Sequence, residues 1–387
     1  MRLVIDGRRL TAARTGVGRY LESLLEEWAV DGLPLPEGVL VLKDGSGLER
    51  VPRINGLECV VLGERWPGLL WERWALGRVL RAGDLLFAPA NLVPACWVGT
   101  TVLAIQDTIQ EVLPESFPWH VRMRFARRYR RAAQSANRIL VPSDSTRRDV
   151  ERFYGVSHSQ IEVIHPGPDP ELRPLDPGAP LVRQAREALG LGDAPYFLFL
   201  GKRSKRRNVP VICQAFDRHR REFPAHRLVF AGPATPRELG AARDSDRGIL
   251  LAGHVSEPIL RGLLAGAVAL LYPSLYEGFG LPVVEAMASG CPVVTLANSA
   301  LVEVGGKAVL YVQEPDADSL AGAMKRLSSD PSYRANLAGL GIEQAARFSR
   351  PSFARAVGHA LQSVASEASR PTMAGERAVA LGASRSQ

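Results

Sequence analysis

The sequence predicts an α/β protein with two domains. Its 387 residues are enough for two domains of usual size, and a hydrophobic content of 46% with 36 glycines and 28 prolines is ordinary for globular α/β proteins. Along most of the chain, apolar runs of strand length alternate with glycine-containing loops and with stretches of helical periodicity. We therefore expect two α/β cores rather than one large core.

The composition argues against several classes of protein. No apolar stretch is as long as a membrane-spanning helix, and Met1–Asp6 has the pattern of a short strand rather than of a signal peptide, so we expect a cytoplasmic protein. The four cysteines have no paired spacing, which argues against disulfide bonds and against a zinc site. They are Cys59, Cys96, Cys213 and Cys291.

The first predicted strand, Arg2–Asp6, leads through two glycines to a helix that we expect from about Arg19. A glycine loop before a helix is an arrangement that cradles phosphate, because backbone N–H groups are free at the helix N-terminus. Gly16 and Gly18 are too few for a dinucleotide-binding fingerprint, so this motif is weak when it stands alone. Arg19 is placed to assist an anion at the same loop.

The next elements end in polar residues. A helix is expected over Trp71–Leu80, and Asn91 fits an ordinary turn after the following strand. The strand Thr101–Asp107 then ends in Gln106 and Asp107. Glutamine donates and accepts hydrogen bonds but cannot titrate, which weakens any claim for a general base at Gln106. Asp107, at the carboxyl end of a strand, either contacts a ligand in a cleft or caps its own loop.

The densest basic segment is Trp119–Ala133, which has six arginines and no acid. At helical spacing, Arg124, Arg127, Arg128 and Arg131 share one side, with apolar side chains near the other. Two interpretations stay open, a solvated helix face and an amphipathic helix seated on an anionic membrane surface. We do not expect nucleic-acid binding, because no recognised nucleic-acid-binding module accompanies the charge.

The proline-rich segment Pro170–Pro180 is interpreted as the linker between the domains. Before it come a strand over Arg138–Val141, a helix capped near Ser143 or Asp144, and a further strand that ends at His165. We therefore predict an N-terminal domain over residues 1–180 and a C-terminal domain over residues 181–349.

The second domain opens with the apolar strand Tyr196–Leu200, a basic loop and a helix from about Pro210. Arg206 and Arg207 in this loop are candidates to bind phosphate, since arginine can do so bidentately and ligands of α/β proteins bind at the carboxyl ends of strands. Lys202 is a further cation of the same loop. The alternative interpretation is a solvated basic loop.

The most informative segment is Tyr272–Val294, which has the pattern strand, glycine loop, helix and strand. Glu277 lies in its loop, and Glu285 lies in the first turn of its helix, where Pro282 suits the first position. A helix N-terminus that opens from a glycine loop favours a diphosphate. Glu285 could then accept hydrogen bonds from ribose hydroxyls, and Glu277 could meet a sugar. Otherwise, Glu285 complements the helix dipole and Glu277 is a solvated loop acid.

The order Glu277, seven residues, Glu285, inside EGFGLPVVEAMASGCPVV, resembles the signature of retaining glycosyltransferases of family 4, which have the GT-B fold. The resemblance extends over roughly residues 2–365. It implies two Rossmann-like, doubly wound parallel-sheet domains that face a cleft, with a helix over residues 350–365 that returns to the N-terminal domain. Residues 366–387 are rich in Ser, Ala, Arg and Gly and are expected to form a disordered tail.

The resemblance also implies roles for particular residues. The residues implied in catalysis are Glu277, Arg206, Arg207 and Asp107. The residues implied in donor binding come from both domains and are Glu285, Gly278, Phe279, Gly280, Leu281, Lys202, His254, Val255, Gly16 and Gly18. The candidates on the acceptor side are Gln106, Asn91 and Arg19, and many relatives have histidine where this chain has Gln106.

The activity that the resemblance implies is transfer of a hexose, with retention of configuration, from a nucleotide-diphosphate sugar to a glycan, lipid-linked or small-molecule acceptor. The form TGVGRY at residues 15–20 resembles bacterial mannosyltransferases of the family, so GDP-mannose is the preferred donor, while UDP-glucose, UDP-N-acetylglucosamine and dTDP-deoxysugars stay open. Nothing resembles the acidic metal-binding motif of other glycosyltransferases, so neither a metal nor a cofactor is expected. The alternatives are a non-catalytic sugar-nucleotide or glycan-binding protein and a sugar-nucleotide epimerase on the same fold.

Overall fold

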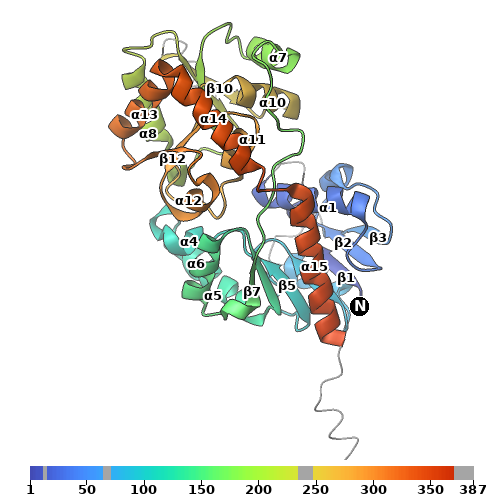
Figure 1. Cartoon of the computed structure of the whole chain (residues 1–387). Helices are drawn as coiled ribbons and strands as arrows, with labels where there is room; N and C mark the ends of the chain where they lie inside the picture. The colour runs from blue at the N-terminus through green and yellow to red at the C-terminus, as the bar shows by residue number, and fades with distance from the viewer. Residues whose placement is uncertain (12–14, 64–70, 234–246, 370–387) are drawn as a thin grey trace, which may run out of the picture.

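The structure is a computed structural model that describes residues 1–11, 15–63, 71–233 and 247–369. Figure 1 shows two α/β units, the N-terminal one below and the C-terminal one above, with the last helix lying along the lower unit. Each unit is built around one parallel sheet, seven-stranded in the first and six-stranded in the second. The structure thus confirms the predicted pair of Rossmann-like parallel-sheet domains.

The N-terminal sheet has the strand order β3-β2-β1-β4-β5-β6-β7. Its strands are β1 (Leu3–Asp6), β2 (Gly38–Leu42), β3 (Leu57–Val61), β4 (Leu85–Ala88), β5 (Thr100–Ala104), β6 (Arg138–Val141) and β7 (Ile161–Val163). The C-terminal sheet has the order β10-β9-β8-β11-β12-β13. Its strands are β8 (Tyr196–Leu200), β9 (Arg227–Ala231), β10 (Ile249–Gly253), β11 (Ala269–Tyr272), β12 (Val293–Leu296) and β13 (Leu310–Val312).

Both strand orders are doubly wound, because the direction of strand addition reverses once in each sheet. The reversal lies between β1 and β4 in the first sheet and between β8 and β11 in the second. In open α/β sheets of this kind, ligands bind outside the carboxyl ends of the strands at the reversal. The topology therefore points to the loops that follow β1, β4, β8 and β11.

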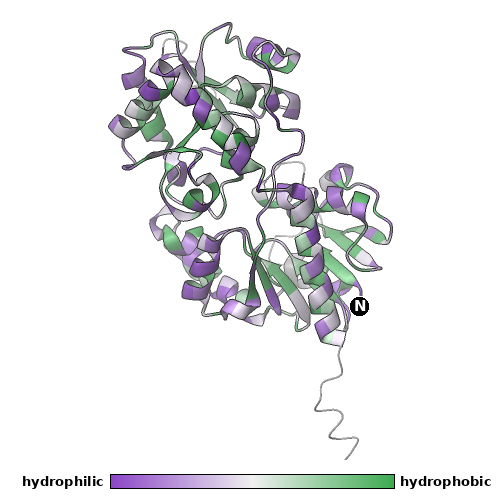
Figure 2. Cartoon of the chain, viewed as in Figure 1, coloured by the Kyte–Doolittle hydropathy of each residue, from purple (hydrophilic) through white to green (hydrophobic). Residues whose placement is uncertain are grey.

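The central strands are continuous apolar runs because helices cover both faces of each sheet. Every residue of β8 and of β11 is buried, and Figure 2 shows the strands of the lower sheet as mainly hydrophobic. Among the described residues, each sheet has one hydrophobic cluster on each of its faces, and none of these clusters extends over both sheets. The prediction of two separate α/β cores is thus confirmed.

The helices of the N-terminal domain are α1 (Gly16–Asp31), α3 (Gly77–Val79), α4 (Ile109–Val112), α5 (Trp119–Ser135) and α6 (Asp144–Tyr154). Its short helical segments are η1 (Gly45–Arg50), η2 (Trp71–Leu76), η3 (Pro114–Ser116) and η4 (His158–Gln160). The C-terminal domain contains η5 (Lys205–Arg207) and the helices α7 (Pro180–Ala188), α8 (Val209–His219), α10 (Glu257–Gly266), α11 (Leu281–Ala288), α12 (Ser299–Gly305), α13 (Ala317–Ser329) and α14 (Pro331–Ala345). The last helix is α15 (Arg350–Ser369).

Helix α15 packs on the N-terminal domain, although it follows the C-terminal domain in sequence (Figure 1). The ring of Phe353 meets that of Tyr20 edge-on at 4.9 Å, and the indole N–H of Trp28 donates to the Ala354 carbonyl at 3.3 Å. The helix continues to Ser369 rather than ending at 365, so the expected disordered tail does not begin at 366. The remainder of that tail, residues 370–387, lies outside the described residues.

Three predicted elements have different bounds in the structure. Helix α1 begins at Gly16 rather than Arg19, because the Thr15 side chain caps it by accepting from the Gly18 N–H. The predicted helix over 71–80 is a π-helical segment followed by one short helical turn. Strand β5 ends at Ala104, so Gln106 and Asp107 lie in the loop beyond it.

The chain passes between the domains twice, and the two passages touch at Gly167. A β-carbon at Gly167 would lie 2.2 Å from the backbone nitrogen of Arg350, so only glycine fits at this crossing. Among the described residues, no helix is long and apolar enough to span a membrane.

Candidate functional site

A cavity of about 340 Å³ lies between the two domains, at the carboxyl ends of both sheets. Its N-terminal wall is formed by Arg9, Thr15, Gly16, Val17, Arg19, Tyr20, Ser23, Gln106, Asp107 and Pro142. Its C-terminal wall is formed by Arg206, Arg207, Tyr272, Glu277, Gly278, Phe279, Gly280, Leu281 and Pro282, and Pro166, Gly167 and Phe353 complete the lining. Loops that follow β1, β8 and β11 all contribute, as the two reversal points of the sheets predict.

Glu277 is the centre of the C-terminal wall and is only 7% exposed. Its Oε1 accepts hydrogen bonds from the hydroxyls of Tyr272 and Ser274, each at 2.9 Å, and pairs with Arg206 Nη1 at 2.5 Å. Burial alone would raise the pKa of Glu277, but the positive charges of Arg206 and Arg207 outweigh it and hold that pKa below its ordinary value. The interpretation of Glu277 as a solvated loop acid is therefore wrong.

Arg206 and Arg207 are held in place by backbone carbonyls as well as by Glu277. Arg206 donates to the Tyr276 carbonyl at 3.0 Å, and Arg207 donates to the Leu200 carbonyl at 3.0 Å. Arg207 also lies over the ring of Tyr272, 5.3 Å from its centroid. Burial acts to lower the pKa of Arg206, but Glu277 raises it above its ordinary value. Two guanidinium groups fixed in this way can stabilise negative charge in the cavity without rearranging.

The glycine loop before α11 brings backbone to the cavity. Gly280 has a φ of 100°, which a side chain would oppose, and α11 starts directly after it with no side-chain cap. Gly278 has a different role, which is to let the backbone of this loop approach the backbone of the N-terminal domain closely. A β-carbon at Gly278 would lie 2.0 Å from the Gln106 carbonyl oxygen. The free N–H of Leu281 at the helix start is thus available to an anion.

Glu285 faces the other domain from the first turns of α11. Its side chain is 2% exposed and forms an ion pair with Arg19 of α1, which is 29% exposed. The negative charge of Glu285 raises the pKa of Arg19 above its ordinary value. In this state Glu285 is bound to a basic side chain of the opposite domain, a contact that the sequence did not indicate.

The predicted acceptor-side residues form a network behind the cavity. The Asn91 side chain accepts from the Gln106 N–H at 2.9 Å and donates to the Asp107 carbonyl at 3.4 Å. Gln106 Nε2 donates to the Pro89 carbonyl at 3.3 Å. Burial raises the pKa of Asp107 although Arg206 opposes it. Gln106 and Asp107 line the cavity, whereas Asn91 holds the loop that carries them.

Several predicted residues do not line this cavity. Lys202 and His254 are exposed side chains outside the lining, and Val255 also lies outside it. Gly18 packs under the turn after β1, where a β-carbon would lie 2.8 Å from the Arg9 carbonyl oxygen. Gly16, by contrast, lines the cavity.

Sequence reasoning missed Arg9, Tyr20, Ser23 and Tyr272 as cavity residues. Arg9 and Tyr272 follow the rule that ligand-binding residues gather at the ends of parallel strands, which was applied to Arg206 but not to these positions. Tyr20 and Ser23 follow Arg19 on α1 and gave no separate signal.

Hydrogen bonds between the domains close one side of the cavity. Ser143 and Thr146 donate to the Gly278 carbonyl at 2.6 and 2.9 Å, and Ser143 also caps α6 as predicted. Tyr276 contacts Thr108 at 2.8 Å through the two hydroxyls. Glu303 of α12 accepts from the backbone N–H of Asp144. These contacts fix the glycine loop against the N-terminal domain.

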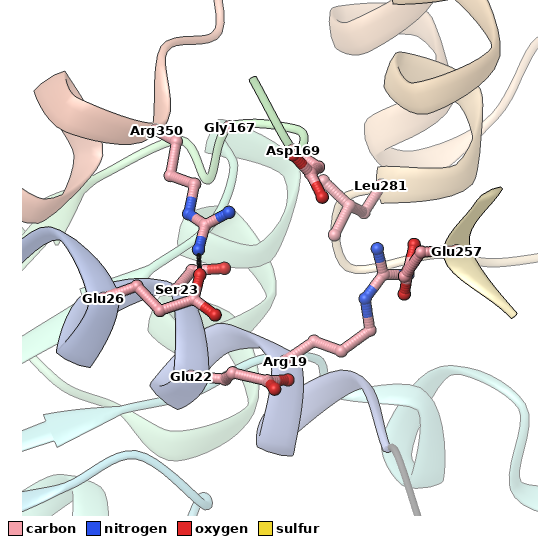
Figure 3. Close-up of a pocket in the computed structure, with 9 residues that line it drawn as sticks. All are labelled: Arg19, Glu22, Ser23, Glu26, Gly167, Asp169, Glu257, Leu281 and Arg350. Carbon is pink, nitrogen blue, oxygen red and sulfur yellow. Dashed lines mark ion pairs between the residues drawn. The ribbon is translucent and has the colours of Figure 1, made fainter. Parts of the chain in front are cut away.

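A smaller side pocket of about 50 Å³ adjoins the cavity (Figure 3). It is lined by Arg19, Glu22, Ser23, Glu26, Gly167, Asp169, Glu257, Leu281 and Arg350. Figure 3 shows Arg19 reaching from α1 toward the start of α11, and Arg350 paired with Glu26. Within the described ranges, no group of three His, Cys, Asp or Glu residues could hold a metal ion.

Two protein-family models match parts of the chain. Residues 14–172 match "Glycosyltransferase Family 4", and residues 194–330 match "Glycosyl transferases group 1". O-antigen chain mannosyltransferase B of Escherichia coli is 26% identical over 376 residues, which are 90% of this chain and 96% of that protein. MMP alpha-(1->4)-mannosyltransferase of Mycolicibacterium hassiacum is 30% identical over 213 residues, which are 54% of this chain and 49% of that protein.

Solved structures share the whole architecture. Sucrose-phosphate synthase from Thermosynechococcus elongatus, 18% identical, gives a TM-score of 0.73 over 94% of this chain and 98% of that chain. HepE from Anabaena, in complex with UDP and glucose and 17% identical, gives a TM-score of 0.72 over 94% of this chain and 99% of that chain. At these identities the likeness establishes the arrangement of the two domains.

Proposed function

Because the chain belongs to the glycosyltransferases of family 4 and has their GT-B fold, we propose that it transfers a hexose from a nucleotide-diphosphate sugar with retention of configuration. The observation that carries the proposal is the pair Arg206 and Arg207, fixed around Glu277 in the cavity between the domains. Such a pair suits a leaving group that gains negative charge, as a nucleoside diphosphate does.

In this proposal the donor lies along the C-terminal wall. Glu285 accepts the ribose hydroxyls, and the diphosphate lies against Arg206, Arg207 and the Leu281 N–H. The sugar then lies beside Glu277, whose hydrogen bonds to Tyr272 and Ser274 hold its carboxylate in place. The same bonds make Glu277 a poor nucleophile, which supports attack by the acceptor on the face that the diphosphate leaves. Because the arginines and the helix supply positive charge, we propose that transfer needs no divalent metal.

The donor that we propose is GDP-mannose, with UDP-glucose as the alternative. Two of the relatives are mannosyltransferases by name. HepE, which has the same fold, has been solved with UDP-glucose, so a uridine nucleotide also fits an architecture of this kind. The acceptor is a glycan, a lipid-linked glycan or a small molecule.

We also propose a peripheral membrane contact through α5. Trp119 and Met123 on its first turns are 75% and 54% exposed. The helix also carries exposed arginines, namely Arg122, Arg127, Arg130 and Arg131. Exposed apolar side chains beside cations suit a surface of anionic lipid, and the protein would then act at the inner face of the membrane from the cytoplasm.

The test is turnover of GDP-mannose, UDP-glucose and UDP-N-acetylglucosamine, with and without EDTA. We expect one donor to release its nucleoside diphosphate at a rate that EDTA does not change. Arg206→Ala should lower that rate about 100-fold, because a fixed donor to the leaving group is removed. Lys205→Ala, in the same loop but outside the cavity lining, is the matched control and should stay within about twofold.

Two results would contradict the proposal. Nucleotide binding without release of a diphosphate would favour a non-catalytic sugar-nucleotide-binding protein. Release of a free epimerised donor with no glycosylated product would favour an epimerase. A third result concerns the metal only. If EDTA abolished the activity and a divalent cation restored it, the proposed independence of a metal would be wrong, but the proposed transfer reaction would stand.

A further inference from the structure

Tyr276 belongs to the C-terminal domain, but its hydroxyl is bound by the N-terminal domain. The residue lies in the loop between β11 and α11, directly before Glu277, and is only 3% exposed. Its hydroxyl donates to Oδ2 of Asp149 on α6 at 2.8 Å. Burial and the negative charge of Asp149 raise the pKa of Tyr276, so the hydroxyl keeps its proton and is the donor in this contact.

The carboxylate of Asp149 also holds the loop that follows β5. The hydroxyl of Thr108 donates to the same Oδ2 at 3.2 Å and lies 2.8 Å from the Tyr276 hydroxyl. The Thr108 N–H donates to the Tyr276 hydroxyl at 3.4 Å. Thr108 comes directly after Asp107, which lines the cavity. One carboxylate thus fixes a residue beside Asp107 and a residue beside Glu277.

The main chain around Tyr276 holds the loop that follows β8. The Tyr276 carbonyl accepts from Arg206 at 3.0 Å, and the N–H of Leu275 donates to the Arg206 carbonyl at 2.8 Å. On the other side, the N–H of Glu277 donates to the Ser299 hydroxyl at 3.1 Å. A displacement of Tyr276 would therefore shift the guanidinium and the carboxylate of the C-terminal wall together.

Asp149 depends on hydroxyl donors. Its side chain is partly buried, and within the described part of the chain it forms no ion pair with a lysine or an arginine. A partly buried carboxylate without a counter-charge needs hydrogen-bond donors. Tyr276 and Thr108 supply them, so this carboxylate stays satisfied only while α6 and the two loops remain together.

We propose that Tyr276 is a positioning residue for the transfer reaction, because its hydroxyl bond to Asp149 sets the position of the C-terminal wall relative to Asp107. The inference rests on the proposed function, which places the donor diphosphate at Arg206 and the sugar beside Glu277. Tyr276 does not line the cavity, so it acts through its neighbours and not by contact with the donor.

The reaction and the binding of nucleotide depend on this position to different degrees. The proposed donor lies along the C-terminal wall, so nucleotide binding depends mainly on that wall. Transfer needs both walls, because the acceptor must approach the sugar while the leaving diphosphate is stabilised. A misplacement of about 1 Å can cost on the order of 100-fold in rate. Loss of the Tyr276 hydroxyl should therefore lower kcat and leave nucleotide affinity nearly unchanged.

The test compares Tyr276→Phe with the matched control Tyr196→Phe. Each substitution removes one buried hydroxyl, and that of Tyr196 donates to the Leu263 carbonyl at 2.8 Å, away from the cavity lining. The rate measured is release of nucleoside diphosphate from saturating GDP-mannose, or from UDP-glucose if that is the donor. We expect Tyr276→Phe to lower kcat about tenfold or more, while Kd for GDP or UDP by calorimetry stays within about twofold. Tyr196→Phe should keep both values.

A double-mutant cycle separates positioning from a loss of stability. Asp149→Ala removes the acceptor of the same bond, so combining it with Tyr276→Phe should lower kcat no further than the more severe single substitution does. Asp149→Asn keeps an oxygen that accepts from the hydroxyl and should recover part of the rate. Additive losses, wild-type kcat in Tyr276→Phe, or an equal loss of nucleotide affinity would overturn the inference while the proposed function stands.

Hydrogen–deuterium exchange of the free protein tests the inference if no donor is turned over and the proposed function fails. We expect Tyr276→Phe to speed exchange in residues 105–109 and 274–277, because these two loops share the Asp149 anchor. Tyr196→Phe should change exchange in neither loop. Unchanged exchange in Tyr276→Phe would show that the hydroxyl does not hold the loops, and the inference would be wrong.

Discussion

At the scale of single residues, the cavity depends on a buried carboxylate that two arginines keep ionised. Glu277 is covered by Tyr272, Ser274 and Arg206, so each of these groups would lose a partner if its charge were removed. The lowered pKa of Glu277 means that the folded state favours its ionised form. Stability that arises in this way is fully present above the unfolded pKa and is lost as the pH falls through the folded pKa.

Glu277→Gln should therefore destabilise the protein at neutral pH, on the order of 3 kcal/mol, because Arg206 and Arg207 keep their charges without a counter-charge. The difference from wild type should be constant at pH values above the ordinary pKa of 4.5 and should shrink as the pH falls below it. Urea unfolding at several pH values measures this difference. The exposed Glu314→Gln is the control, and a difference that grew on acidification would contradict the assignment of an ionised Glu277.

The partners of the two site carboxylates could not be predicted from the sequence. Arg206 is 70 positions from Tyr276, the residue directly before Glu277, and Arg19 and Glu285 are separated by 266 positions. A motif indicates which residue types gather at a strand end, but it does not indicate which side chain of another loop will pair with them. For the same reason Lys202, close in sequence to Arg207, was expected in the site, whereas the structure places it outside the cavity lining.

At the scale of elements, the segments with strong local signals were the ones predicted best. Strand β8 and the start of α11 have the predicted positions, because a continuous apolar run and a glycine-proline start act locally. Strand β5 was predicted too long because a tertiary contact ends it, with the Asn91 side chain taking the Gln106 N–H. Helix α14 gave little periodic signal and was not predicted.

Helix α5 is the element whose role is most directly testable. Trp119→Ala together with Met123→Ala should lower binding to vesicles that contain anionic lipid about tenfold or more, because two exposed apolar side chains no longer insert. Binding should also fall as salt is raised, since the arginines act through screened charge. Vesicle sedimentation measures both effects.

The matched control for α5 is Val302→Ala, which removes an exposed apolar side chain from the C-terminal domain. It should leave vesicle binding unchanged. Equal binding to neutral and anionic vesicles, or no effect of the α5 substitutions, would contradict the membrane contact. It would favour the other interpretation of this basic segment, a solvated helix face.

At the scale of the whole molecule, the cavity exists because the domains meet at a few defined points. Gly278 is the tightest of them, since its carbonyl accepts from Ser143 and Thr146 while its α-carbon lies against Gln106. The glycine loop of one domain is thereby positioned by the other. Donor binding and the relative position of the domains should thus be coupled.

Gly278→Ala should separate the domains at this point, because the added β-carbon would lie 2.0 Å from the Gln106 carbonyl oxygen. We expect turnover to fall about tenfold or more and unfolding free energy to fall by roughly 1–3 kcal/mol, as for other overpacked sites. Gly322→Ala on α13, where a β-carbon meets nothing within 4 Å, is the control and should be neutral or slightly stabilising. Wild-type turnover by Gly278→Ala would show that the contact is not needed for the reaction.

Helix α15 has a consequence for how this enzyme could be divided. Its side chains Phe353, Val357 and Leu361 belong to the hydrophobic core of the first domain, although the whole C-terminal domain separates them in sequence from the predicted linker Pro170–Pro180. A fragment that stopped at the linker would expose the apolar surface that α15 covers, and a fragment that began there would carry a helix with nothing to pack on. The two halves are therefore expected to behave as complementary pieces that recover activity only when combined, rather than as independent modules that could be exchanged between enzymes.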